Sequence, residues 1–154
     1  MKPAAARLRV AQIDDLDALV ALEQHFTGDR MSRRAFRHLL HSASATIWLA
    51  QASAQTLGAL VLLTRRGSRR ARIYSVVVSP AARGQGLGRR LVQRAEREAR
   101  QLGYIGVSLE VRQDNQPARA LYAALRYTVL AELPGYYEDG AAGLRLRRDF
   151  PTRP

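Results

Sequence analysis

The chain has 154 residues, no cysteine and a formal net charge of +12 at pH 7. This length suits a single domain with a continuous core, which we expect over residues 1–154 with the core at about 7–150. The absence of cysteine excludes disulfides, thiolate metal sites and an acyl-cysteine intermediate.

The first half of the chain predicts one strand, two helices and two further strands. RLRVAQ alternates as a strand does, and the apolar spacing that follows Asp15 is typical of a helix. FTGDRMS, residues 26–32, is predicted to be a loop, with Ser32 placed to cap a second, basic helix. ATIWLAQA and TLGALVLLTR are expected to pair as strands across a tight turn.

The second half predicts strands and helices that alternate until a closing hairpin. ARIYSVVVS has too little alternation for one wet face, so we expect it centrally in the sheet. A helix stripe runs from Leu87 to Leu102, YIGVSLEVR is the next strand, and a short helix opens at Asn115. The order βααβββαβαββ predicts an α/β (α+β) fold, a mixed twisted sheet of about seven strands flanked by about four helices.

The stretch VVVSPAARGQGLGRRL places a glycine-rich turn between a buried strand and a helix start. Free backbone N–H groups and the macrodipole at such a helix start attract anions, and Gly84, Gly86 and Gly88 let a phosphate approach closely. The spacing excludes a P-loop, which needs Gly-Lys-Ser/Thr, and a dinucleotide fingerprint, which needs G-x-G-x-x-G. From the spacing alone, a glycine turn without a ligand is the alternative.

Further motifs give this run a family context. VSPAARGQGLGRRL matches the acetyl-CoA signature R/Q-x-x-G-x-G/A of the GNAT N-acetyltransferases at Arg83, Gly86 and Gly88. LEVRQDN and NQPARALYAALRY resemble the other half of that family's site, N-x-x-A-x-x-L-Y, and the element order agrees. With the later YYEDG, the chain most resembles the ribosomal-protein-alanine (RimI) subgroup. The resemblance implies a single GNAT-type domain.

The resemblance implies acetyl-CoA as co-substrate, with no metal. The valine strand would offer backbone groups to the pantetheine arm, the signature loop would wrap the diphosphate, and Asn115 would bond the arm beyond the thioester. The expected cofactor-binding residues are Val76, Val77, Val78, Arg83, Gly84, Gln85, Gly86, Leu87, Gly88, Arg89 and Asn115.

Acetyl transfer needs a base for the amine and an acid for the leaving thiolate. Within the matched motifs, Glu110 is the expected base, directly or through a water, and Tyr122 the expected acid. A phenol with a pKa near ~10 can protonate a thiolate near ~8.5 if it lies within hydrogen-bond reach. From the residues alone, Glu110 also fits a solvated strand face beside Arg112, and Tyr122 also fits ring packing in the core.

The last hairpin contains the residues that the resemblance assigns to the acceptor. Tyr136, Tyr137 and Glu138, with Asp139, would form part of the acceptor pocket, where acidic groups steer a cationic amine or a basic peptide. A polar turn with two half-exposed tyrosines is the alternative. The expected reaction is direct transfer in a ternary complex to a primary amine, either a protein N-terminal α-amine or a small amine.

Two departures from the family pattern affect these expectations. Arg126 stands where the family often has glycine, so the local turn is expected to differ. FTGDRMS replaces the tryptophan–serine pair that the ribosomal-alanine enzymes tend to carry. The acceptor therefore cannot be taken over from the subgroup.

A non-catalytic CoA-binding or RNA-associated module is the rival from another class. The basic charge suits a polyanion, but an arginine-biased composition on solvated faces gives the same excess. Aromatic residues are not interleaved with the arginines, so we expect no specific nucleic-acid partner, and a monomer or homodimer. Without a bilayer-length apolar stretch or an apolar core in MKPAAARLRV, we expect a cytoplasmic protein with no membrane partner.

Overall fold

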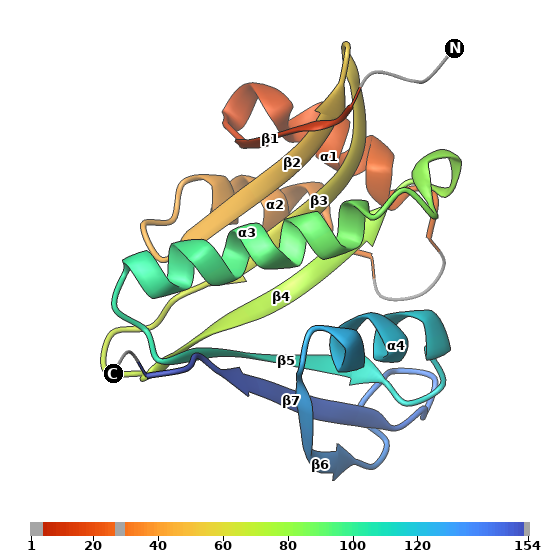
Figure 1. Ribbon diagram of the computed structural model, residues 1–154. Coiled ribbons are helices and arrows are strands. Elements are labelled where there is room, and N and C mark those ends of the chain that lie inside the picture. The colour runs from red at the N-terminus through yellow and green to blue at the C-terminus, as the bar shows by residue number, and fades with distance from the viewer. Residues whose placement is uncertain (1–4, 27–29, 153–154) are drawn as a thin grey trace.

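The computed structural model describes residues 5–26 and 30–152, in which seven strands and four α-helices follow the expected order (Figure 1). Two short 3-10 turns, η1 and η2, are added to that order. Residues 27–29 of the predicted 26–32 loop lie outside the described residues. The elements are β1 (Arg7–Val10), η1 (Ile13–Asp15), α1 (Leu16–Glu23), α2 (Arg33–Leu40), β2 (Ala45–Ala52), β3 (Gln55–Leu63), β4 (Arg70–Val78), η2 (Pro80–Ala82), α3 (Leu87–Gln101), β5 (Gly106–Arg112), α4 (Gln116–Ala124), β6 (Thr128–Leu133) and β7 (Gly143–Asp149).

The seven strands form one mixed sheet in the order β1-β2-β3-β4-β5-β7-β6. β4 lies at its centre, as the weak alternation of its sequence predicted. β4 and β5 run parallel with α3 as their crossover, and every other pairing among the described strands is antiparallel. The predicted fold class is confirmed.

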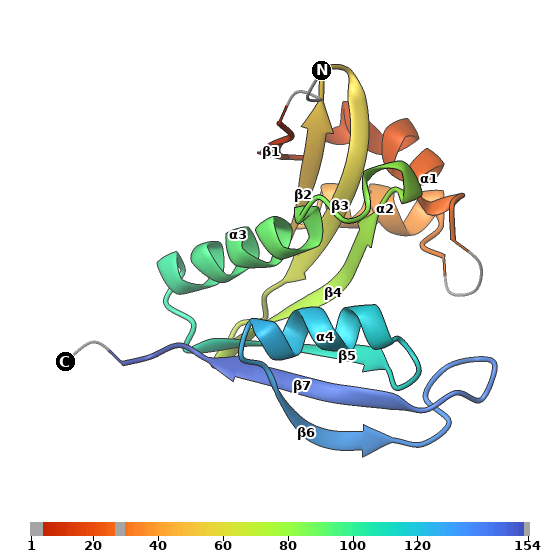
Figure 2. The ribbon, with the colours of Figure 1, turned by 45° about the vertical axis from the view of Figure 1, so that its right-hand side comes forward.

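Helices pack on both faces of the sheet, but over different strands (Figure 1, Figure 2). α3 lies on one face because its apolar residues recur at helical spacing; the buried ones are Leu87, Leu91, Val92, Ala95 and Ala99. α1 and α2 pack on the opposite face against β2 and β3, in a cluster that does not extend over β5 and β7. Among the described residues, no helix is both long and apolar enough to cross a membrane.

β4 and β5 pair along only part of their lengths. The paired residues run from Arg70 opposite Gly106 to Ile73 opposite Leu109. Beyond this point residues 76–78 pair with β3 but not with β5, and Figure 1 shows the two strands diverging. The divergence leaves one edge of β4 without a strand partner and opens the sheet at its centre.

Arg126 follows α4 and has a φ of 71°, in the left-handed region. Its backbone N–H donates to the carbonyl of Ala123 (3.0 Å), and the next residue, Tyr127, donates to the carbonyl of Tyr122 (2.9 Å). The expectation that arginine would change this turn is therefore wrong. Arg126 adopts the left-handed backbone conformation that glycine adopts at a lower energetic cost. The two hydrogen bonds of the turn hold Arg126 in this conformation.

A buried charge network ties α3 to the last strands. The Glu96 carboxylate accepts hydrogen bonds from the Tyr127 hydroxyl (2.8 Å) and from Arg148 Nη1 (2.9 Å). Its side chain is only 8% exposed. Burial, reinforced by the neighbouring carboxylate, raises the pKa of Tyr127 well above its ordinary value, so its hydroxyl keeps its proton.

We expect Glu96→Ala to lower the free energy of unfolding by about 2–4 kcal/mol, because it leaves a buried hydroxyl and a guanidinium without their shared acceptor. Urea denaturation followed by circular dichroism measures the change. Glu132→Ala, at an exposed position of β6, is the control and is expected to shift the stability by less than about 0.5 kcal/mol. Equal effects of the two substitutions would contradict the structural role of the network.

Candidate functional site

A cleft of about 490 Å³ opens where β4 and β5 diverge. Its walls come from the end of β4, the turn into α3 and one side of α4, which Figure 1 places at the same end of the sheet. The lining residues are Phe26, Val76, Val77, Val78, Ala82, Arg83, Gly84, Gly86, Leu87, Gly88, Arg89, Asn115, Pro117, Ala118, Leu121 and Tyr122.

The cleft brings the predicted cofactor residues together, although they come from two separated segments. All of them line it except Gln85. The lining also includes Ala118 and Leu121, which are positions of the matched motif N-x-x-A-x-x-L-Y, and Phe26, Ala82 and Pro117, which were not predicted. The α4 residues could have been found from their shared helix face with Tyr122. Phe26 comes from an irregular segment with no periodic signal, yet its ring lies 5.9 Å from the Arg83 guanidinium.

The start of α3 is built as an anion site. Gly84 and Gly86 have φ angles of 79° and 76°, and a Cβ on either would meet nothing within 4 Å. Gly86 is the N-cap residue, and no side chain caps the helix. The first backbone N–H groups of α3 are therefore open toward the cleft and carry the positive end of the helix dipole. Two arginines, Arg83 and Arg89, line the same region.

Asn115 has one of its polar atoms already occupied. It is the N-cap residue of α4, and its Oδ1 accepts a hydrogen bond from the Ala118 backbone N–H (3.1 Å). The predicted helix start at this residue is therefore confirmed. Its side-chain NH₂ group is the part left to donate to a ligand in the cleft.

Tyr122 reaches the cleft from α4 and is 6% exposed. Its ring packs edge-to-face on Tyr127, with the centroids 5.4 Å apart. Burial raises the pKa of Tyr122 well above its ordinary value, so the phenol stays protonated. Its hydroxyl makes no hydrogen bond with the residues that the structure describes. The hydroxyl can therefore donate a hydrogen bond to a ligand in the cleft.

Glu110 lies on the opposite face of β5 from the cluster that contains Tyr122. Its neighbours Leu109 and Val111 are buried in that cluster, so the alternating strand directs Glu110 to the face that carries α1 and α2. The Glu110 side chain is 11% exposed, so its carboxylate is largely shielded from solvent and does not lie on an open, solvated strand face. It is not among the residues that line the cleft.

The ion-pair partners of Glu110 differ from the pairing with Arg112 that the sequence left open. Arg72 Nε lies 3.0 Å and Arg145 Nε 3.4 Å from its carboxylate oxygens. Arg112 instead pairs with Asp114 (3.1 Å) and Asp139 (2.8 Å). Both partners of Glu110 come from neighbouring strands, whose register the sequence does not reveal.

The predicted acceptor residues lie in the β6–β7 loop, outside the cleft lining. Tyr136 is 45% exposed, and its ring meets that of Tyr137 edge-to-face at 5.0 Å. The Arg112 guanidinium lies 5.1 Å from the Tyr137 ring, and Asp139 forms an ion pair with the same arginine. Glu138 is exposed. Of the two loop acids, Glu138 is thus better placed to attract a cationic amine.

Among residues 5–26 and 30–152, no three histidine or acidic side chains gather in a group that would hold a metal ion. The cleft is lined mainly by backbone, glycine, apolar side chains and two arginines. This donor set suits an anionic ligand with an apolar arm.

The parallel strands β4 and β5 separate, and an open helix start lies at the point of separation. This arrangement can accommodate a ligand that carries phosphate. Residues 13–127 match the acetyltransferase (GNAT) family, and the chain belongs to that family. It is 38% identical over 78 residues, half of this chain, to the N-alpha-acetyltransferase RimI of Mycobacterium tuberculosis.

Solved structures share the fold along nearly the whole chain. A ribosomal-protein-alanine N-acetyltransferase from Escherichia coli has a TM-score of 0.87 at 21% identity, covering 97% of this chain and 96% of its own. NAA60 from Arabidopsis thaliana, solved in complex with acetyl-CoA, has a TM-score of 0.82 at 16% identity, covering 94% and 99%.

The chain spans less than half the length of the curated relatives that it matches. It covers 48% of the M. tuberculosis protein and 38% of an uncharacterised protein from Mycobacterium leprae, to which it is 32% identical over 140 residues. The expected GNAT family and the resemblance to RimI-type proteins are confirmed. The roles of individual residues stay predictions.

Proposed function

We propose that this chain transfers the acetyl group of acetyl-CoA to a primary amine, with a protein or peptide α-amine as the acceptor. The cleft at the β4–β5 split carries the proposal, because it joins an anion site at α3 to the buried hydroxyl of Tyr122. The RimI-type relative and the acetyl-CoA complex of a structurally similar protein support the same reaction class.

The cleft residues fit acetyl-CoA. The open N–H groups of α3, with Arg83 and Arg89, would hold the diphosphate. The unpaired edge of residues 76–78 would hydrogen-bond the amide groups of the pantetheine arm, and Leu121 would supply an apolar contact. Gly88 packs beside Leu121, since a Cβ there would lie at an ordinary contact distance of 3.4 Å from Leu121 Cδ2.

Acetyl-CoA supplies an acetyl group activated as a thioester. Transfer forms one C–N bond and breaks one C–S bond, while a proton leaves the amine and another reaches the sulfur. The chain has no cysteine to carry the acetyl group, which favours direct transfer within a ternary complex.

Tyr122 is proposed as the acid that donates to the sulfur. Its raised pKa makes it a weak acid in isolation. The same apolar surroundings penalise a thiolate, however, and so raise the proton affinity of the leaving sulfur as well. Proton transfer between two groups desolvated in one cleft therefore keeps its driving force.

Glu110 is proposed as the base, because its side of the sheet is the one from which an acceptor amine would approach. An α-amine, whose pKa is near ~8, loses its proton more readily than a lysine side chain near ~10.4, and this favours an α-amine as the acceptor.

A panel of acceptors incubated with acetyl-CoA tests the proposal, with thiol release as the readout. We expect release with peptides that have a free α-amine, and mass spectrometry should locate the acetyl group on the α-nitrogen. Peptides blocked at the N-terminus but containing lysine are the control. Release with small amines alone would reject the peptide acceptor, and release with none would reject the reaction.

The pH dependence of kcat/KM should reflect the titration of the acceptor amine and not that of Tyr122. Because burial raises the pKa of Tyr122, its proton is retained as pH rises through the ordinary phenol range. We therefore expect kcat/KM for a peptide to rise with pH, to level off above about pH 8 as the α-amine loses its proton, and to stay level to about pH 10. A descending limb below pH 9 would contradict the assigned acid.

A further inference from the structure

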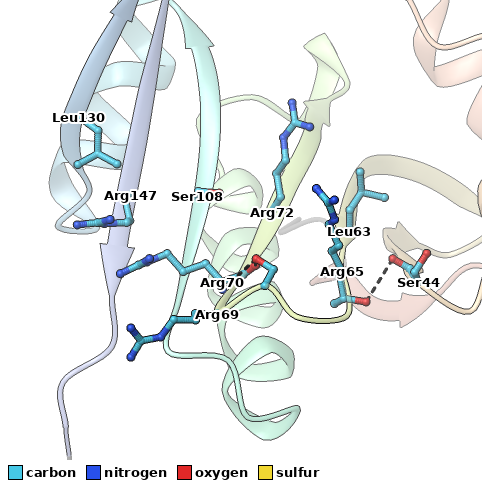
Figure 3. A pocket seen from close by; sticks show the side chains of 11 residues that line it. Ser44, Leu63, Arg65, Arg69, Arg70, Arg72, Ser108, Leu130 and Arg147 are labelled. Carbon is cyan, nitrogen blue, oxygen red and sulfur yellow. Dashed lines mark hydrogen bonds between the residues drawn. The ribbon is translucent and has the colours of Figure 1, made fainter.

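A second cavity, of about 640 Å³, lies on the α1/α2 side of the sheet near the β3–β4 loop. Its side chains come from the residue before β2, from the end of β3, from the β3–β4 loop and from β4, β5, β6 and β7 (Figure 3). The lining residues are Ser44, Leu63, Thr64, Arg65, Ser68, Arg69, Arg70, Arg72, Ser108, Leu130 and Arg147. Five arginines and no acidic side chain are among them, so we call it the arginine pocket.

The charges in the arginine pocket are only partly neutralised. Asp149 pairs with Arg70 (2.7 Å) and Arg147 (3.7 Å), and Arg69 also acts on its charge. Figure 3 shows these three guanidinium groups extending toward the same side of the pocket. One carboxylate thus serves three cations, and these lower the pKa of Asp149. A second anion would relieve the repulsion among the three arginines.

The arginine pocket is contiguous with the proposed catalytic base. Arg72 lines the pocket and also holds Glu110, which it meets at 3.0 Å. Ser108 lines the pocket two residues before Glu110 on the same face of β5. Two residues of a strand span about 7 Å. One short ligand could therefore reach the pocket with one group while its amine lies beside Glu110.

We infer that the arginine pocket binds an acidic side chain of the acceptor peptide, near its third residue. This rests on the proposed function. An extended peptide advances about 3.3–3.6 Å per residue, so with its α-amine beside Glu110 its third residue lies about 7 Å away. That residue shares a strand face with the first, and it reaches the level of Ser108 if the peptide runs along β5 toward the pocket. Exposed Glu138, at the other end of β5, would favour the cationic amine.

Matched peptides test this inference. Three amidated peptides differ only at the third residue, which is glutamate, glutamine or lysine, and all begin with the same small residue. We expect kcat/KM to be at least roughly tenfold higher for glutamate than for lysine, with glutamine between them, and the ratio to shrink as salt rises. The double variant Arg69→Gln/Arg147→Gln should reduce the ratio to near one. Arg97→Gln, which removes an exposed arginine of α3 far from β7, should preserve it.

Three outcomes would overturn the inference, and they are distinguishable. Transfer to all three peptides with equal kcat/KM would reject the acidic acceptor while leaving the proposed function intact. Absence of transfer to any peptide would reject the proposed function itself. An RNA oligonucleotide could instead inhibit acetyl transfer to all three peptides equally at physiological salt. If the Arg69→Gln/Arg147→Gln variant lost this inhibition, the pocket would be assigned to nucleic acid and not to the peptide.

Discussion

We expect Tyr122→Phe to lower kcat by roughly 100-fold or more and to leave the Kd for acetyl-CoA within about twofold of the original protein. The substitution removes one hydroxyl from the cleft and keeps the ring, so binding surfaces are retained while the proton donor is lost. A positioned general acid contributes a factor of about 100 to 10,000. Steady-state turnover and calorimetric titration of acetyl-CoA measure the two quantities separately.

Tyr127→Phe is the matched control for this prediction. It deletes a hydroxyl from a ring 5.4 Å away that donates to Glu96 and does not line the cleft. We expect it to lower stability by about 1–2 kcal/mol and to change kcat by less than about threefold. A kcat that is unaffected by Tyr122→Phe, or reduced equally by both substitutions, would remove Tyr122 from the role of acid.

We expect Gly86→Asp to weaken acetyl-CoA binding by roughly tenfold to a hundredfold. Aspartate is a favourable N-cap residue and tolerates the left-handed region better than most, so the helix start should persist. Its carboxylate would accept hydrogen bonds from the α3 N–H groups and place a negative charge where the diphosphate is expected. Two like charges about 4 Å apart cost about 1–4 kcal/mol near a protein surface.

Gly86→Asn is the control that distinguishes the effect of the aspartate charge from the effect of the side-chain shape. It caps the helix in the same way and has nearly the same volume, but it is neutral. We expect its Kd for acetyl-CoA to lie between those of the original protein and Gly86→Asp, with thermal midpoints of both variants within a few degrees of each other. If the Gly86→Asp variant bound acetyl-CoA as tightly as the original protein does, the helix start would not hold the diphosphate.

Local patterns were enough to predict most of the fold. The order of elements, the central place of β4 and the buried stripe of α3 follow from periodicity, because one face of each element must be covered. The positions of the cleft residues could also be predicted, since a strand, a glycine turn and a helix are contiguous in the chain.

The remaining features depend on register and on long-range packing. Glu110 meets Arg72 and Arg145 because of the pairings of β5 with β4 and β7, which no local pattern specifies. The residues of the arginine pocket come from segments far apart in the chain, so the sequence alone does not indicate that its arginines lie together. At Arg126 the hydrogen bonds of the turn outweigh the residue's local preference, which a propensity argument cannot weigh.

Calorimetric titration of acetyl-CoA, in parallel with acetyl-pantetheine, tests the central claim most directly. The second compound keeps the thioester and the arm but lacks the diphosphate and the adenosine 3′-phosphate that is attached to it. If the amides at the start of α3 hold that group, acetyl-CoA binds the folded protein and acetyl-pantetheine binds at least roughly 100-fold more weakly, since each charge-assisted hydrogen bond contributes about 1.5–3 kcal/mol. Comparable binding of the two compounds, or no binding of acetyl-CoA, would contradict the account.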